Sequence, residues 1–269
     1  MNRNRLLAAA AAALVIFAAM SSRDARAEGW GNIKGQFVLD GEVPPPKLLV
    51  KKGDPNVKDA ACCAKQNVPS DELVVDPVTK GIQHIFVYLR RAPAIHPDLA
   101  QPKEKEVVFD QVGCRFVPHT LFIQAGQTVV LKSNDGCAHN TNATFFRNQS
   151  FNVLIPPKER KGLRVTLTAG EFLPSRVECN IHPWMSARWL VLDHPYAAIT
   201  DAEGRFEIQK LPAGEHSFYV WHEIPGYVTK GFEGLSAVKP YKRGFTVVVE
   251  DGKTTDIGVV KVPKSVFEQ

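Results

Sequence analysis

Short apolar runs separated by turn residues dominate this chain of 269 residues and limit its fold more than any other feature. Several runs alternate apolar with polar residues, which is the pattern of a strand with one buried face. Gly, Pro, Asn and Asp lie between the runs and favour turns. The pattern predicts an all-β protein built from antiparallel sandwiches. The expected strands are 33–39, 85–89, 120–123, 128–132, 164–167, 189–192, 205–208, 217–221, 245–249 and 256–262.

The first 27 residues have the features of a cleaved signal peptide. Arg3 and Arg5 precede an uncharged apolar run of 15 residues, 6–20, and Ala25-Arg26-Ala27 matches an A-x-A cleavage site. The run is short for a bilayer-spanning helix, so an uncleaved anchor is the less favoured alternative. We expect cleavage after Ala27, a mature chain of 269 − 27 = 242 residues without a membrane span, and a periplasmic or secreted location.

Removal of the signal peptide also changes the charge balance. The whole chain has a formal net charge of +5, and residues 1–27 contribute four Arg and one Asp, or +3, so the mature chain has 5 − 3 = +2. No basic stripe with interleaved aromatic residues appears, and we therefore expect no nucleic-acid partner.

One stretch of seven residues, Cys179-Asn180-Ile181-His182-Pro183-Trp184-Met185, concentrates metal-binding side chains at the spacing C-x2-H-x2-M. A thiolate, an imidazole and a thioether are three of the ligands of a blue-copper centre, which combines one Cys, two His and a weak axial Met. Cys179 and His182 can reach one metal ion from a tight loop, and Met185 can reach its axial side if the loop folds back. Zinc is the competing metal, since Cys and His suit it too, but the thioether favours copper.

A second His is needed from another segment, and His139 within 134–140 offers one. Because His139 lies 40 residues before Cys179, it must come from a neighbouring strand end, and loops at one end of a β-sandwich converge in this way. Residues 176–178 would form the strand that enters the Cys179 loop, and 189–192 the strand that leaves it. Taken singly, each residue has an alternative role. Cys179 could form a disulfide, Met185 could fill the core, and His139 could be an ordinary loop residue.

The cysteine count agrees with this interpretation. The chain has five Cys, and disulfides persist in an oxidising compartment. If Cys179 binds metal, an even number remains: Cys62, Cys63, Cys114 and Cys137. A bond between adjacent Cys62 and Cys63 would be strained, so each is expected to pair with Cys114 or Cys137. The sequence leaves both of these pairing patterns open.

With these motifs, residues from about 81 to 194 resemble the cupredoxins. The Cys179–Met185 stretch is similar to the ligand loop of amicyanin, and Asn134 with His139-Asn140 resembles the segment that supplies the first His in this family. The resemblance implies a Greek-key sandwich with one type 1 copper ion held by His139, Cys179, His182 and Met185. It also implies that Asn140 ties the two ligand loops together near the thiolate. Cys137 and His119 depart from the family pattern.

The C-terminal part resembles the small prealbumin-like, or immunoglobulin-like, sandwich of carboxypeptidase regulatory-like domains. The similarity lies in residues 200–208 and in the Leu211-Pro212-Ala213-Gly214 turn. We therefore expect a signal peptide at 1–27, an N-terminal strand and irregular extension packed on the cupredoxin domain at 28–80, a cupredoxin-like domain at 81–195 and the smaller sandwich at 196–269.

The function expected from these features is electron transfer without catalysis, between a redox donor and acceptor that the sequence does not identify. The alternatives are a copper-binding or metallochaperone module and a non-redox interaction protein. A copper oxidase or nitrite reductase would need a second, His-rich copper cluster, and the chain has no H-x-H pair. Pro183 and Trp184 beside His182 suggest an apolar contact patch for electron exchange. His222 lies between Trp221 and Glu223, and we expect a structural role for it rather than a metal site.

Overall fold

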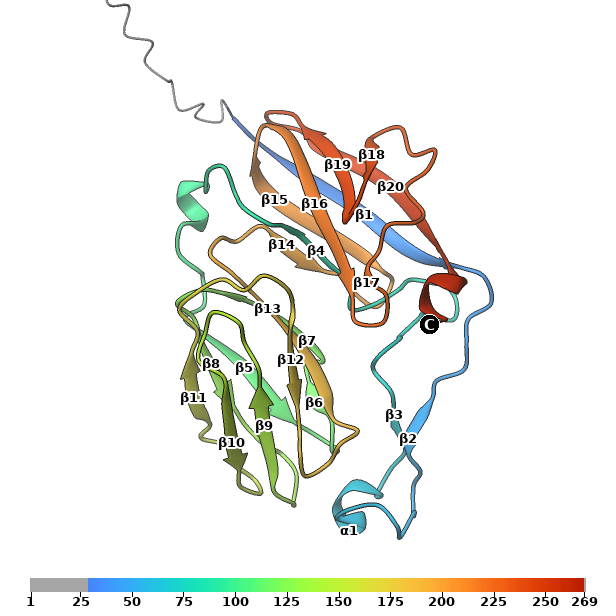
Figure 1. Ribbon diagram of the computed structural model, residues 1–269, viewed down its shortest axis with the longest axis vertical. Coiled ribbons are helices and arrows are strands. Elements are labelled where there is room, and N and C mark those ends of the chain that lie inside the picture. Colours follow the sequence, from blue (N-terminus) through green and yellow to red (C-terminus); the bar gives the residue numbers. More distant parts are fainter. Residues whose placement is uncertain (1–28, 269) are drawn as a thin grey trace, which may run out of the picture.

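The computed structural model describes residues 29–268 and shows two β-sandwiches stacked along the long axis, with a separate extension beside the lower one (Figure 1). The predicted signal peptide, 1–27, lies outside the described residues. Strands account for almost all regular structure, and the described residues contain one short α-helix, α1 (Ala60–Cys63), and two 3-10 turns, η1 (Pro97–Leu99) and η2 (Lys264–Phe267). No helix in residues 29–268 is long and apolar enough to span a membrane.

The first sandwich, drawn in green to yellow in Figure 1, carries the Cys179 loop. Its five-stranded sheet has the order β10-β9-β12-β13-β7, and its four-stranded sheet has the order β11-β8-β5-β6. Phe109, Val129, Val177 and Trp189 are fully buried between the two sheets. The strands are β5 (Glu106–Gln111), β6 (Phe116–Val117), β7 (Thr120–Gln124), β8 (Thr128–Leu131), β9 (His139–Ala143), β10 (Phe151–Ile155), β11 (Leu163–Thr166), β12 (Ser175–Glu178) and β13 (Ser186–Leu192).

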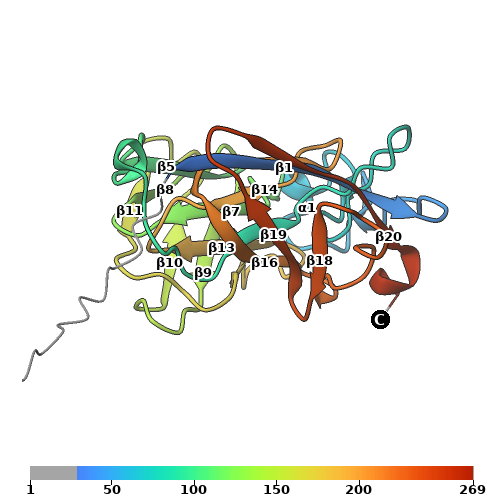
Figure 2. The same cartoon turned by 90° about the horizontal axis from the view of Figure 1, so that it is seen from above.

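The second sandwich pairs a three-stranded sheet, β15-β1-β20, with the sheet β14-β4-β16-β19-β18, to which β17 adds through β16. Figure 2 shows β1 and β20 side by side, in agreement with their parallel pairing. The strands are β1 (Trp30–Asp40), β4 (Phe86–Leu89), β14 (Ala197–Ile199), β15 (Arg205–Pro212), β16 (Gly214–His222), β17 (Gly226–Tyr227), β18 (Val238–Tyr241), β19 (Gly244–Val249) and β20 (Thr254–Pro263).

Two strands lie in a different sandwich from the one expected. The sequence predicted that residues 28–80 pack on the metal-binding domain and that this domain begins at 81. Instead β1 lies between β15 and β20, and β4 lies between β14 and β16. The reason is hydrophobic burial, because Ile33 and Phe37 of β1 and Val87 of β4 lie in the core of the second sandwich. The chain therefore begins in the second sandwich, passes through the first and returns.

Two disulfides attach the extension of residues 47–72 to the first sandwich. It contains a two-stranded ribbon of β2 (Leu48–Val50) and β3 (Val68–Pro69), with α1 between the two strands. In Figure 1 it lies beside the lower end of the first sandwich, away from β4 and β14. We call residues 47–72 the cap, because they cover the Cys179 loop.

The two sandwiches contact each other through a shared apolar cluster. Phe86 and Tyr88 of β4, Leu190 and Leu192 of β13 and Tyr219 of β16 are buried together. Because β13 is also the strand that follows the Cys179 loop, the second sandwich packs against the scaffold of that loop.

All ten expected strands are present, with bounds that differ by at most four residues. The all-β class is therefore confirmed. The pairing is not wholly antiparallel: β1–β20, β7–β13 and β5–β8 are parallel. Each of these parallel pairs joins strands that are separated by at least one other element, as a crossover connection requires.

Candidate metal centre

The Cys179–Met185 loop connects β12, which ends at Glu178, to β13, which begins at Ser186. The two strands are antiparallel neighbours, so the loop closes a tight hairpin. The Cys179 amide donates to the Met185 carbonyl at 3.1 Å, and the Met185 amide donates to the His182 carbonyl at 2.9 Å. The His182 amide also donates to Cys179 Sγ at 3.3 Å. These bonds fix the loop and direct the Cys179 sulfur inward.

His139 is the first residue of β9, which pairs with β12, so it lies at the same end of the sandwich as the loop. The structure brings its ring to the other two candidate ligands: His139 Nδ1 lies 2.9 Å from His182 Nδ1, and His182 Nδ1 lies 3.8 Å from Cys179 Sγ. One donor atom from each of the three residues falls within 4.8 Å of the other two. A trigonal metal with bonds of about 2 Å needs donors about 3.5 Å apart, so this set fits one ion with a small outward movement of the rings.

Met185 is 2% exposed and packs in the same buried cluster as Cys179. His139 and His182 are fully buried, and Cys179 is 1% exposed. Three of the four residues predicted from sequence, His139, Cys179 and His182, therefore gather at one buried position, and Met185 is buried in the same core cluster as Cys179.

Asn140 joins the two segments, as the family resemblance implied. Its Oδ1 accepts from the amides of Asn180 at 2.8 Å and Ile181 at 3.2 Å, and lies 3.3 Å from Cys179 Sγ. Its Nδ2 donates to the Asn180 and Asn152 side chains. One buried side chain thus holds β9 against the Cys179 loop.

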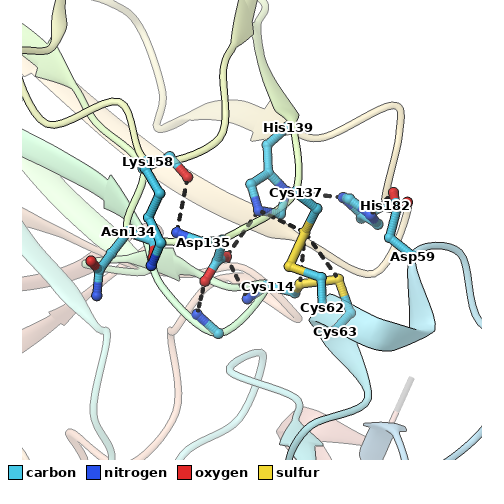
Figure 3. Close-up of a disulfide and its surroundings, with 12 residues drawn as sticks. Asp59, Cys62, Cys63, Cys114, Asn134, Asp135, Cys137, His139, Lys158 and His182 are labelled. Atoms are coloured by element: carbon cyan, nitrogen blue, oxygen red, sulfur yellow. Dashed lines mark hydrogen bonds and ion pairs between the residues drawn. A yellow bond between two sulfur atoms is a disulfide. The ribbon is translucent and has the colours of Figure 1, made fainter.

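Two carboxylates that the sequence analysis did not select support the histidines (Figure 3). Asp135 Oδ2 lies 2.9 Å from His139 Nε2, and Asp59 Oδ2 of the cap lies 3.0 Å from His182 Nε2. With Nε2 hydrogen-bonded to a carboxylate in each ring, Nδ1 remains for a metal, which is a recurrent arrangement in metal sites. Asp135 is itself fixed by the Gly113 and Cys114 amides at 2.7 and 2.8 Å.

The same contacts determine the protonation of the metal-free site. Burial opposes a charged His139, but its hydrogen bonds to Asp135 and Cys179 outweigh burial and raise its pKa to about 9. Burial likewise disfavours the Cys179 thiolate, but hydrogen bonds from His139 and His182 lower its pKa to about 6. At neutral pH the site thus holds a thiolate beside an imidazolium.

The other four cysteines form the pairing Cys62–Cys137 and Cys63–Cys114. Each of the adjacent cysteines therefore has a separate partner, as expected, and Cys179 remains free and buried. Cys137 Sγ lies 3.9 Å from His139 Nε2, and Figure 3 shows both bridges beside Asp135 and His139. The unusual Cys137 is thus a cross-link that anchors the cap next to the first candidate ligand.

His119, which departs from the family pattern, and His222, for which the sequence predicted a structural role, do not join this group. His119 Nδ1 lies 3.0 Å from the Ser186 carbonyl, and its Nε2 pairs with Glu223 of the second sandwich. His222 is fully buried, accepts a hydrogen bond from the Ile224 amide and packs edge-on against Phe267.

The apolar contact patch expected around His182 is not present as an open surface. His182 is fully buried under Asp59, and Trp184 packs against Val50, Ala64 and Val68 of the cap. The sequence did not predict that the cap covers His182, because residues 47–72 show no regular strand or helix pattern. A cavity of about 180 Å³ remains on the Met185 side of the loop, with Pro183 and His119 among its lining residues.

The fold and these side chains define an all-β protein with a candidate mononuclear metal centre. No protein-family model matches the chain, and no curated protein matches it. Among solved structures, a copper-containing nitrite reductase from Thermus scotoductus SA-01 is 24% identical over 36% of this chain and 27% of its own, with a TM-score of 0.30. This chain therefore spans about a quarter of the length of that reductase chain.

Two other solved structures match a similar share of the chain. A purple cupredoxin from Nitrosopumilus maritimus is 18% identical over 31% of this chain and 97% of its own, with a TM-score of 0.26. An oxidised amicyanin variant is 15% identical over 35% of this chain and 88% of its own, with a TM-score of 0.28.

Proposed function

We propose that this chain is a mononuclear type 1 copper protein that carries single electrons between redox partners in the periplasm or outside the cell. The observation that carries the proposal is the convergence of His139 Nδ1, His182 Nδ1 and Cys179 Sγ at one buried point, with Met185 buried on the same loop. Bound copper would supply one-electron exchange between Cu(I) and Cu(II).

The donor set favours copper over zinc. Structural zinc sites use four strong ligands, whereas this group offers three and a thioether. Soft thiolate and thioether ligands suit Cu(I), and imidazole suits both oxidation states. The low pKa of Cys179, about 6, keeps the thiolate available for the metal at neutral pH.

The rigidity and burial of the group favour an electron carrier over a metallochaperone. A chaperone passes its ion to a partner by ligand exchange, which needs an exposed ligand, and here all four side chains are at most 2% exposed. Asn140, the loop hydrogen bonds and the two carboxylates hold the donors in place, so little has to move when the metal changes charge.

The described residues also favour a carrier over an enzyme. Besides this group, two other sets of possible metal ligands occur in residues 29–268. One consists of the four disulfide-bonded cysteines, and the other shares His139. A second copper centre for substrate chemistry therefore has no separate set of free ligands in this part of the chain.

Copper titration of the purified mature chain, followed by visible spectroscopy and redox titration, tests the proposal. We expect one Cu(II) per chain, an intense thiolate-to-copper band and reversible one-electron reduction. Cys179→Ser should abolish the band, whereas His216→Gln, in the second sandwich, should leave it unchanged. A colourless Cu(II) protein, or tight Cu(I) binding without a reversible couple, would refute the electron-carrier assignment and favour the metallochaperone.

A further inference from the structure

The cap covers the outer edge of His182, where the imidazole would otherwise face solvent. Asp59 Oδ2 lies 3.0 Å from His182 Nε2, and His182 is fully buried although the Asp59 side chain is 40% exposed. Trp184 packs on the apolar cluster of the cap, and its Nε1 donates to the Cys114 carbonyl at 3.2 Å. The outer nitrogen of one candidate ligand is therefore bound by a residue from 123 positions earlier in the chain.

The backbone at Asp59 is arranged for this contact. Asp59 is the N-cap residue of α1, a position where an Asp side chain ordinarily accepts from the helix amides. Here the side chain makes no such bond, and the residue has φ 50° and ψ 47°. Non-glycine residues are uncommon in this left-handed region. Such a conformation, together with the unused capping position, points to a role for the carboxylate elsewhere.

The two disulfides fix Asp59 relative to the metal centre. Cys62 and Cys63 follow it by three and four residues, and their amides both donate to the Asp59 carbonyl. Their bridges lead to Cys137, two residues before His139, and to Cys114, whose amide holds Asp135. Asp59 and Asp135 are thereby held on one cross-linked unit, each against one histidine.

We propose that Asp59 is a positioning residue through which the cap orients His182 and lowers the reduction potential of the centre. A carboxylate on Nε2 fixes the ring with Nδ1 toward the metal and makes that nitrogen a stronger donor. Its negative charge stabilises Cu(II) more than Cu(I), because the oxidised ion carries the larger charge. This inference rests on the proposed function, and it concerns a residue outside the four ligands.

The variant Asp59→Asn tests the charge, because it keeps an acceptor oxygen at nearly the same place. Loss of an outer-shell partner typically weakens metal binding by about 10 to 100-fold. Because Asp59 is partly exposed, we expect the effect of its substitution to lie at the lower end of this range. We expect the ratio of Cu(II) to Cu(I) affinity to fall by up to about tenfold, which corresponds to an upward shift of up to ~59 mV in the potential. The thiolate-to-copper band should persist.

Asp54→Asn is the matched control, since Asp54 lies on the same loop and its Oδ1 accepts only from the nearby Asn56 amide. It removes the same charge without touching His182. A potential in Asp59→Asn no higher than in Asp54→Asn would overturn the inference even if the wild-type protein is blue. A wild-type protein without the band would instead refute the proposed function.

A measurement on the copper-free protein separates positioning from charge. With histidine labelled by ¹⁵N, NMR should show a His182 Nε2–H that exchanges slowly with solvent in the wild type and in Asp54→Asn. In Asp59→Ala that proton should exchange at least tenfold faster, because the acceptor is gone. Equal exchange rates in the wild type and Asp59→Ala would overturn the positioning role.

Discussion

The two disulfides of the cap close overlapping loops. Their contributions to the free energy of unfolding are therefore not expected to add. Cys62–Cys137 and Cys63–Cys114 close 75 and 51 residues respectively. Taken alone, loops of these lengths stabilise the native chain by about 4.5 and 4.1 kcal/mol through the entropy of the unfolded state. Because Cys62 and Cys63 are adjacent, however, either bridge already brings the partners of the other close together.

With one bridge present, the second closes only the path between Cys114 and Cys137, which are 23 residues apart, plus the peptide link between Cys62 and Cys63. By the same dependence of unfolded-state entropy on loop length, a loop of about 24 residues stabilises the native chain by about 3.4 kcal/mol. Removing either bridge alone should therefore cost about 3.4 kcal/mol, although the two loops differ in length. Removing both should cost about 7.5 to 8 kcal/mol, which exceeds the sum of the single losses.

Guanidinium unfolding of the copper-free mature chain measures these losses. The variants are Cys62→Ala/Cys137→Ala, Cys63→Ala/Cys114→Ala and the combination of all four substitutions. Alanine removes both sulfurs of a bridge, so no unpaired thiol is added to Cys179. If the combined loss is no larger than the sum of the two single-bridge losses, or if the single losses match the separate-loop values of about 4.5 and 4.1 kcal/mol, the shared-loop argument is refuted.

Three further predictions concern the site and its surroundings. Asn140→Ala should lower the free energy of unfolding by about 1 to 3 kcal/mol, because it leaves the Asn180 and Ile181 amides without their acceptor; an unchanged unfolding midpoint would contradict this. The absorbance of the Cys179 thiolate in the copper-free protein should titrate near pH 6, since hydrogen bonds outweigh burial; a midpoint near 9 would show that His139 and His182 do not stabilise it. Burial lowers the pKa of His194 to about 4. Between pH 6.5 and pH 4 the unfolded chain therefore binds a proton at this residue, whereas the native chain does not. Between pH 7 and 4 the wild type should therefore lose about 3 kcal/mol more stability than His194→Gln, as urea unfolding at the two pH values would show.

Local sequence patterns predicted the parts of the site that are close together in the chain. The spacing of Cys179, His182 and Met185 placed them on one loop, and the need for a second imidazole selected His139, which begins the neighbouring strand. The sequence analysis did not select Asp135 as a partner of His139, although it lies four residues earlier. An Asp in a loop ordinarily indicates a turn.

Contacts between distant segments were not predictable in the same way. β1 alternates as a strand should, but nothing in Trp30–Asp40 indicates that its partners are β15 and β20. Asp59 reaches His182 only because the disulfides bring the cap to the loop, and the sequence left the pairing of Cys62 and Cys63 open. The sequence placed His139 at a strand end but did not give the extent of β9. Its sequence, HNTNA, has no apolar alternation, and polar side chains such as His139 and Asn140 fill its buried positions.

The ligand loop is held from two sides by segments that flank the first sandwich in sequence. From the cap, Asp59 binds the outer nitrogen of His182. From the second sandwich, Glu223 pairs with His119, whose other nitrogen lies 3.0 Å from the carbonyl of Ser186, the residue after Met185. Arg188 of β13 also lies 3.2 Å from Glu223. A sandwich that carried the loop alone would leave both of these edges to water. The parts of the chain outside the first sandwich therefore complete the surroundings of the candidate metal centre.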